Sequence, residues 1–187
     1  MTKNRFYAFI RALAIPFVRL IYPFRLTGAE NVPAEGPVVL CSNHRSNLDP
    51  LFLAIGIKHR ELHFMCKKEL FKTKLTAAFF TKLGMFAVDR GHTDMSAMRN
   101  AMSLIREGRV FAIFPQGHRY KLDDHRELLS GATLIAMRSG AKIVPIHIGS
   151  VKPFRRTDVN IGEAFDLSSI RRPDEATKLL TEAIWKE

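Results

Sequence analysis

The chain has 187 residues, of which 47% are hydrophobic and 25% are charged; this length and composition indicate one globular domain and exclude a disordered chain. Lysine and arginine outnumber aspartate and glutamate by 29 to 18, and the net charge of +11 favours an anionic partner, which would be a nucleic acid, a membrane surface, a phosphorylated metabolite or an acidic carrier protein. The two cysteines, Cys41 and Cys66, lack metal-ligand spacing, which excludes a disulfide scaffold and a cysteine-built zinc site and suits a reducing compartment.

The first 25 residues are basic and apolar, with five cations and no acidic residue: Lys3, Arg5, Arg11, Arg19 and Arg25. The longest apolar run, 12–18, has seven residues, whereas a membrane-spanning helix needs about 20, and no small-residue cleavage site of a signal peptide follows. On a helical wheel the first three arginines fall within an arc of about 120°. We therefore predict that residues 1–30 form an amphipathic helical segment, kinked at Pro16 and ended by Pro23, that lies in the interface of an anionic membrane. The alternative is a first helix that packs on its own domain.

From residue 36 onward, short apolar runs alternate with amphipathic segments. Strands are expected at 37–42, 62–66, 85–88, 109–114, 142–148 and 159–161, and helices at 50–57, 67–82, 94–106, 129–138 and 174–186. This alternation predicts an α/β fold, in which residues 31–187 form a single domain with a largely parallel mixed sheet flanked by helices. Ligands of such sheets bind beyond the carboxyl ends of the strands, so the polar loops 43–49, 89–94 and 116–126 are the candidate site.

The first of these loops contains His44 and Asp49, which follow a predicted strand and precede a predicted helix. Asp before Pro50 is typical of a helix start, with Asp49 as the N-cap. A turn between the strand and the helix would bring the carboxylate to one nitrogen of the imidazole, which fixes the tautomer and makes the other nitrogen a stronger base. Such a pair can remove a proton from an alcohol. The alternative is that Asp49 only caps the helix and His44 is an ordinary loop histidine.

The usual signature of a nucleophilic enzyme is missing from the sequence. There is no G-x-S-x-G elbow, and nothing marks Ser46, in the same loop as His44, as activated. A histidine base without a nucleophilic residue indicates direct attack of a substrate hydroxyl on an acyl group.

Two later loops offer cations at strand ends. Arg90 follows the strand predicted at 85–88, and Arg119 follows the strand predicted at 109–114; an arginine fork in such a place can bind a phosphate. Gly117 allows a tight turn or the close approach of a ligand to the backbone.

Four blocks together resemble the 1-acyl-glycerol-3-phosphate acyltransferases, also called lysophosphatidic acid acyltransferases. Asn43-His44 through Asp49 matches the N-H-x4-D block, 84–90 ends in Asp-Arg, 114–119 matches the block usually written F-P-E-G-T-R, and 144–146 reads Val-Pro-Ile. The resemblance runs from about residue 28 to residue 167.

This resemblance implies transfer of a fatty acyl group from a thioester, either acyl-CoA or acyl-ACP, to the free sn-2 hydroxyl of 1-acyl-glycerol 3-phosphate, giving phosphatidic acid. His44 would be the general base and Asp49 would orient it, without a covalent acyl-enzyme. The residues implied in binding the acceptor phosphate are Arg90, Gln116, Gly117, His118 and Arg119, with Lys67 and Lys68 as a basic pair often found in the family. No bound cofactor or metal is expected. The expected partners are an anionic membrane, a lysophosphatidate-like acceptor and, as a further candidate, an acyl carrier protein, with attachment at the cytoplasmic face of the membrane and no nucleic acid.

Two positions depart from the family pattern, because Gln116 replaces the usual Glu and His118 the usual Thr. An acceptor other than 1-acyl-glycerol 3-phosphate is therefore an alternative: glycerol 3-phosphate, another lysophospholipid or a lyso-aminolipid. A different class of protein, a non-enzymatic basic module that binds membranes, is the remaining alternative. The side chains of His118, Asp123, Asp124 and His125 are of metal-binding types, but nothing in their spacing fixes a metal geometry.

Overall fold

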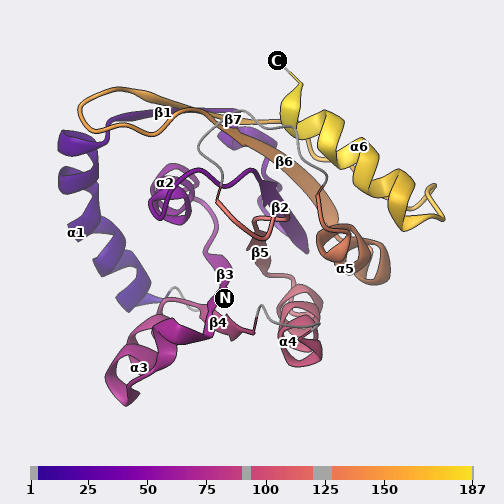
Figure 1. Ribbon diagram of the computed structural model, residues 1–187, viewed down its shortest axis with the longest axis horizontal. Helices are drawn as coiled ribbons and strands as arrows, with labels where there is room; N and C mark the ends of the chain where they lie inside the picture. The colour runs from indigo at the N-terminus through magenta and orange to yellow at the C-terminus, as the bar shows by residue number, and fades with distance from the viewer. Residues whose placement is uncertain (1–3, 90–93, 120–127, 187) are drawn as a thin grey trace.

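The computed structural model describes residues 4–89, 94–119 and 128–186, which fold around one mixed sheet (Figure 1). Within these residues seven strands lie in the order β1-β7-β6-β2-β5-β3-β4. The strands are β1 (Phe24–Thr27), β2 (Val38–Ser42), β3 (Leu62–Lys67), β4 (Met85–Val88), β5 (Val110–Ile113), β6 (Lys142–Ile148) and β7 (Thr157–Ile161). The helices are α1 (Arg5–Ile21), η1 (Ala29–Asn31), α2 (Asp49–Gly56), η2 (Lys68–Phe71), α3 (Lys74–Lys82), α4 (Met95–Arg106), α5 (Gly131–Ser139) and α6 (Pro173–Trp185).

Five neighbouring strands point the same way. β2 pairs in parallel with β5 and β6, and β3 pairs in parallel with β4 and β5, while β7 runs antiparallel to β6 and parallel to β1. The α/β fold with a largely parallel mixed sheet, predicted from the alternating pattern, is confirmed. The connection from β2 through α2 leads to β3 on one side, and the connection from β5 through α5 leads to β6 on the other side. The strand order therefore reverses beside β2, and α/β sheets bind ligands at such a reversal.

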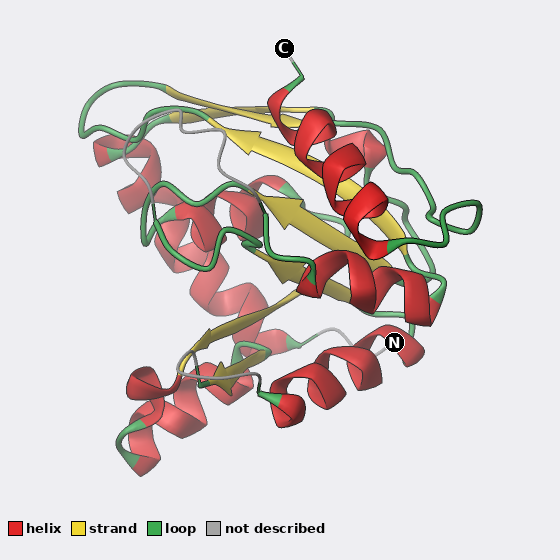
Figure 2. Ribbon diagram, turned by 45° about the vertical axis from the view of Figure 1, so that its right-hand side comes forward, coloured by secondary structure: helices red, strands yellow, loops and turns green. Residues whose placement is uncertain are grey.

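Helices cover both faces of the sheet, which explains why its central strand β2 is apolar from Val38 to Cys41. Figures 1 and 2 show α1 and α2 on one face and α4, α5 and α6 on the other. Val38 and Leu40 of β2 belong to the core under α1 and α2, and Val39 and Cys41 belong to the core under α4, α5 and α6. A strand buried on both faces needs apolar side chains at every position rather than at every second one.

Helix α1 shows an apolar face to the outside. Its side chains Phe9, Leu13, Phe17 and Leu20 are 63%, 64%, 59% and 75% exposed, whereas Tyr7 and Val18 are buried against the domain. The helix continues through Pro16 to Ile21. Among the residues described, no helix combines the length and the apolar character needed to span a bilayer.

Two segments differ from the sequence-based prediction. The helix expected at 67–82 is broken into η2 and α3, because Thr73 adopts an extended conformation and forms a reciprocal capping box with Thr76 that starts a new helix. Strand β1 lies within residues 1–30, which we predicted to be helical; the helix ends at Ile21, and the four residues of β1 instead join the edge of the sheet by parallel pairing with β7.

Candidate active site

The Asp49 carboxylate organises the loop between β2 and α2. Its Oδ2 atom accepts three hydrogen bonds, from His44 Nδ1 at 2.7 Å, from the Arg45 amide at 2.6 Å and from the Ser46 amide at 2.8 Å. The residue is fully buried, and a buried carboxylate is stable only when such donors compensate its charge. The sequence separation of five residues is therefore closed by a turn that wraps around one oxygen atom.

The predicted N-cap role of Asp49 is wrong. The helix begins at Asp49 itself, Leu48 occupies the cap position, and the cap makes no side-chain hydrogen bond. The carboxylate instead points back to the loop, where it finds two amides and an imidazole. Three charge-assisted bonds outweigh the single helix amide that an N-cap side chain satisfies.

His44 lies where the loop meets two cavities. Its ring stacks on Phe114, which follows β5, with centroids 4.1 Å apart and an interplanar angle of 16°. Because Nδ1 donates to a carboxylate, that nitrogen carries the hydrogen and Nε2 keeps its lone pair. The side chain is 11% exposed, so the imidazole is sheltered while one nitrogen is left for a ligand.

Two buried amide side chains fix the backbone on either side of the His44 ring. Asn43 Nδ2 donates to the Ile148 carbonyl at 2.8 Å, and the Ile148 amide donates to Asn43 Oδ1 at 2.7 Å, so Asn43 extends the pairing of β2 with β6. Gln116 Oε1 accepts the His44 amide at 2.8 Å, and the Gln116 residue is 7% exposed. Sequence reasoning assigned Gln116 to phosphate binding and missed this contact, which joins residues 72 positions apart.

A cavity of about 510 Å³ opens on the α1 and α2 side of His44. Most of its wall is apolar, and it contains two of the cations expected to bind phosphate, Lys67 and Arg119. Helix α1 contributes Tyr7 to the wall of this cavity, and burial raises the pKa of the Tyr7 phenol to about 12. The phenol is therefore neutral, and the positive charge in this cavity comes from lysine and arginine.

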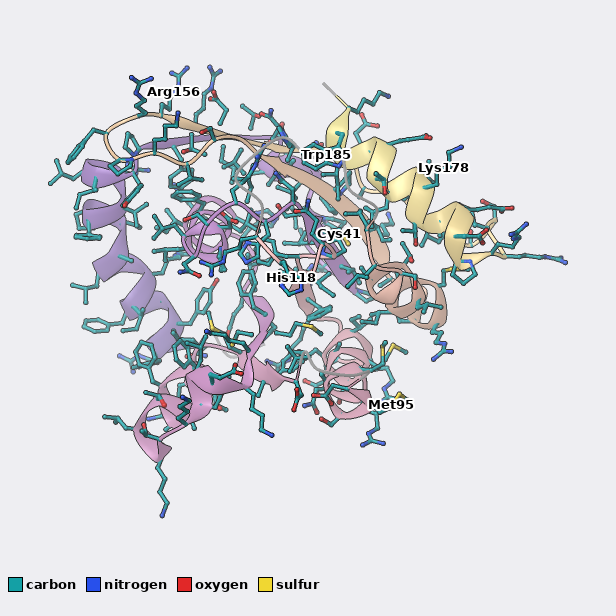
Figure 3. The ribbon with its side chains drawn as sticks, in the orientation of Figure 1. Cys41, Met95, His118, Arg156, Lys178 and Trp185 are labelled. Atoms are coloured by element: carbon teal, nitrogen blue, oxygen red, sulfur yellow. The ribbon has the colours of Figure 1, made fainter. Side chains whose placement is uncertain are left out.

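A second cavity of about 380 Å³ lies on the α4 and α5 side, and His44 and Phe114 line both. Its wall includes aliphatic side chains of α4 and α5 together with Gly117 and His118; Figure 3 shows His118 near the centre of the molecule. The carboxylate of Asp94, which caps α4, also lies here, and hydrogen bonds from the Asp89 amide and from Ser96 hold its pKa well below the usual range. This cavity thus has a permanent negative charge at its edge.

The other residues that the sequence predicted for the site lie in different places in the structure. Gly117 adopts a φ of 72°, the left-handed conformation of a tight turn, and the turn places Arg119 in the larger cavity and His118 in the second. Lys68 is 73% exposed and lies 3.8 Å from Asp89, while its neighbour Lys67 lines the larger cavity. Arg90, Asp123, Asp124 and His125 lie outside the described residues.

The side chains of Cys41 and Ser46 are not arranged for nucleophilic attack on a substrate. Cys41 is fully buried in the sheet, and burial raises the pKa of its thiol, which disfavours the reactive thiolate. Ser46 Oγ accepts the Leu48 amide at 3.2 Å, so the hydroxyl takes part in shaping the loop.

Comparison with known proteins identifies the family of the chain. The model of the family described as Acyltransferase matches residues 23–149. The 1-acyl-sn-glycerol-3-phosphate acyltransferase of Bacillus subtilis is 36% identical over 116 residues, covering 62% of this chain and 57% of that protein. The enzyme of the same name from Streptococcus pneumoniae is 26% identical over 179 residues, covering 91% of this chain and 66% of that protein.

A solved structure shares the fold. The crystal structure of the 1-acyl-sn-glycerophosphate (LPA) acyltransferase PlsC from Thermotoga maritima aligns with a TM-score of 0.75 at 21% identity, covering 97% of this chain and 76% of that one. The chain spans 57% and 66% of the length of the two bacterial relatives named above.

The contact between Gln116 and His44 predicts how two substitutions differ. Gln116→Glu keeps an oxygen for the His44 amide, whereas Gln116→Met keeps the shape and removes the acceptor. An unsatisfied buried amide costs about 1–3 kcal/mol, so Gln116→Met should lower kcat about tenfold to a hundredfold in an acyl-transfer assay, with Gln116→Glu close to wild type. If Gln116 instead bound the acceptor phosphate, Gln116→Glu would raise the KM of the acceptor through charge repulsion, and that result would contradict a positioning role.

Proposed function

The chain belongs to the Acyltransferase family, and we propose that it transfers a fatty acyl group from an acyl thioester to the free sn-2 hydroxyl of 1-acylglycerol 3-phosphate, giving phosphatidic acid. The observation that carries this proposal is the His44–Asp49 pair at 2.7 Å, whose imidazole lines both a cavity that contains cations and a second cavity on the α4 and α5 side. The names of the relatives support this acceptor, and the position of His44 beside the cations of the larger cavity supports a base next to a phosphate-binding site.

In this proposal His44 Nε2 removes the proton of the acceptor hydroxyl while the oxygen attacks the thioester carbonyl carbon. The tetrahedral intermediate then expels the thiolate, and the imidazolium returns its proton to the sulfur. Asp49, which holds Nδ1–H, orients the ring and stabilises the imidazolium. Direct attack, without a covalent acyl-enzyme, agrees with the structural role of the Ser46 hydroxyl.

The larger cavity is the better place for the acceptor. Arg119 and Lys67 line it together with His44, and two cations attract the phosphate of a lysophosphatidate. Holding the phosphate would bring the hydroxyl to the base, and such positioning can contribute several kcal/mol to catalysis. The contact of Gln116 with the His44 backbone means that the replacement of the usual Glu at this position does not itself favour another acceptor.

The second cavity suits the acyl chain of the donor. Its aliphatic and methionine side chains bury hydrocarbon, and the Asp94 carboxylate repels an anionic headgroup. Coenzyme A and acyl carrier protein present the same thioester carbonyl to His44, so either donor fits this arrangement.

Helix α1 would bring the enzyme to its lipid acceptor. Its exposed face is apolar, its cations are Arg5, Arg11 and Arg19 without an acidic residue, and a helix of this kind binds an anionic bilayer interface. Tyr7, Ile10 and Arg11 of the same helix line the larger cavity, so a lipid leaving the bilayer along α1 would reach His44 without crossing water.

Removal of the base tests the chemistry. His44→Ala should lower acceptor-dependent release of thiol from a long-chain acyl thioester by about 10²–10⁴-fold, the usual contribution of a general base. Circular dichroism and vesicle co-sedimentation of the variant should match wild type, because the ring lies at the junction of two cavities. Acceptor-dependent thiol release that persists undiminished would exclude His44 as the base.

Two adjacent lysines test where the phosphate binds. Lys67→Gln removes a cation from the larger cavity and should raise the KM of the acceptor about tenfold, the size of one lost charge-assisted bond. Lys68→Gln removes a cation that faces Asp89 at 3.8 Å and is the matched control, with a KM near that of wild type. Equal effects of the two substitutions would show that only the general positive charge matters.

A further inference from the structure

The loop between β6 and β7 is built as a firm projection. At its base the Gly149 amide donates to the Asp158 backbone carbonyl at 2.9 Å, and Thr157 Oγ1 donates to the Ser150 backbone carbonyl at 3.2 Å. Val151, within the loop, packs against the core. The Arg155 amide closes the tip by donating to the Lys152 backbone carbonyl at 3.3 Å. These bonds give the backbone of residues 149–158 a defined path.

Phe154 at the tip is exposed in a backbone conformation that phenylalanine rarely adopts. The residue is 75% exposed and has a φ of 57°, the left-handed region that costs a bulky residue of the order of 1 kcal/mol or more. A large ring that is both strained and turned to the outside contributes nothing evident to the packing of its own domain. Such a combination points to a function outside the folded chain.

The loop is attached to the end of α1. The Phe154 amide donates to the Ile21 carbonyl at 2.6 Å, and Figure 1 shows the connection between β6 and β7 beside that end of the helix. Leu20, in the last turn of α1, is also 75% exposed. The exposed Phe154 therefore lies next to the last turn of α1, which carries the exposed Leu20.

Three cations lie within two residues of Phe154 in the same loop. Lys152, Arg155 and Arg156 are exposed, and Figure 3 shows Arg156 projecting from the body at this corner. Arg156 lies 3.6 Å from Asp158, whose side chain is 56% exposed, so one of the three charges is partly neutralised. An exposed phenylalanine flanked along the loop by exposed cations matches the interface of an anionic bilayer, where the phenyl ring enters the acyl boundary and the cations meet the lipid phosphates.

We propose that residues 150–156 form a second lipid contact, which inserts Phe154 into an anionic bilayer beside α1. This inference rests on the proposed attachment of α1 to the membrane, but it concerns a separate segment and predicts a separate signal. Because a hydrogen bond joins the loop to the end of α1, the two lipid contacts together would fix the angle of α1 to the bilayer. That angle sets the direction in which the larger cavity faces the lipid.

Tryptophan substitution tests the insertion directly. Phe154→Trp and Leu13→Trp, each compared with the wild-type protein, whose single tryptophan is Trp185, are mixed with phosphatidylglycerol vesicles that carry brominated acyl chains. Both variants should show a blue shift and a loss of emission intensity that wild type does not. Met95→Trp is the matched control, because Met95 is 55% exposed and lies at the opposite corner of the molecule from Arg156 (Figure 3).

The outcomes separate this inference from the proposed function. Quenching at position 13 without quenching at position 154 overturns the loop contact and leaves the attachment of α1 in place. Quenching at neither position overturns both membrane contacts, whatever acyl transfer is measured on acceptor dispersed in detergent. Quenching at Met95→Trp as strong as at Phe154→Trp shows unspecific adsorption and overturns the loop contact.

Affinity variants add an independent readout. Phe154→Asn keeps a residue that tolerates the left-handed conformation, so it should weaken vesicle binding about tenfold without lowering the free energy of unfolding. Lys152→Gln together with Arg155→Gln should weaken binding to anionic vesicles by about 25-fold, about fivefold per charge, while Lys178→Gln on α6 should leave it unchanged. Unchanged vesicle binding in both loop variants, or loop-dependent binding to an oligonucleotide in its place, would overturn the proposal.

Discussion

The buried carboxylate of Asp49 is the constraint on which the rest of the site depends. Its Oδ2 atom holds the imidazole of His44 and the amides of Arg45 and Ser46, so one atom fixes the tautomer of the base and the path of the loop. Asn43 and Gln116 complete this arrangement by holding the backbone on both sides of the ring. Because Asn43, His44, Asp49 and Gln116 are buried, the loss of any one of these side chains would leave a polar atom without its partner.

The parallel strands bring the parts of the site to one edge of the sheet. Residues at the carboxyl ends of β2, β3 and β5 meet there because those strands point the same way. His44 lines both the cavity on one face of the sheet and the cavity on the other. Helix α1 lines the larger cavity and also carries the exposed apolar face. In our proposal the same helix attaches the protein to a bilayer and guides a lipid to the base.

Much of the fold followed from local patterns, whereas the contacts of the site did not. The alternating apolar runs predict the α/β sheet. The helix predicted at 67–82 is divided at Thr73, because Thr73 forms a capping box with Thr76 and so begins a new helix within an otherwise helical pattern. The spacing of His44 and Asp49 indicated the pair, but the cap role failed because the preference of Asp for helix starts says nothing about competing donors in the loop. The bond of Asn43 to Ile148 spans 105 positions, and no pattern along the chain reveals it. The left-handed conformation of Phe154 was equally invisible.

The central claim is that His44, held by Asp49, activates the acceptor hydroxyl for direct attack. Rapid mixing of the protein with a long-chain acyl thioester, followed by mass spectrometry of the intact chain with and without 1-acylglycerol 3-phosphate, tests it most directly. Our account predicts no increase in the mass of the protein under either condition, and thiol release only when the acceptor is present. A stoichiometric burst of thiol without acceptor, accompanied by a gain of one acyl group on the chain, would contradict direct attack.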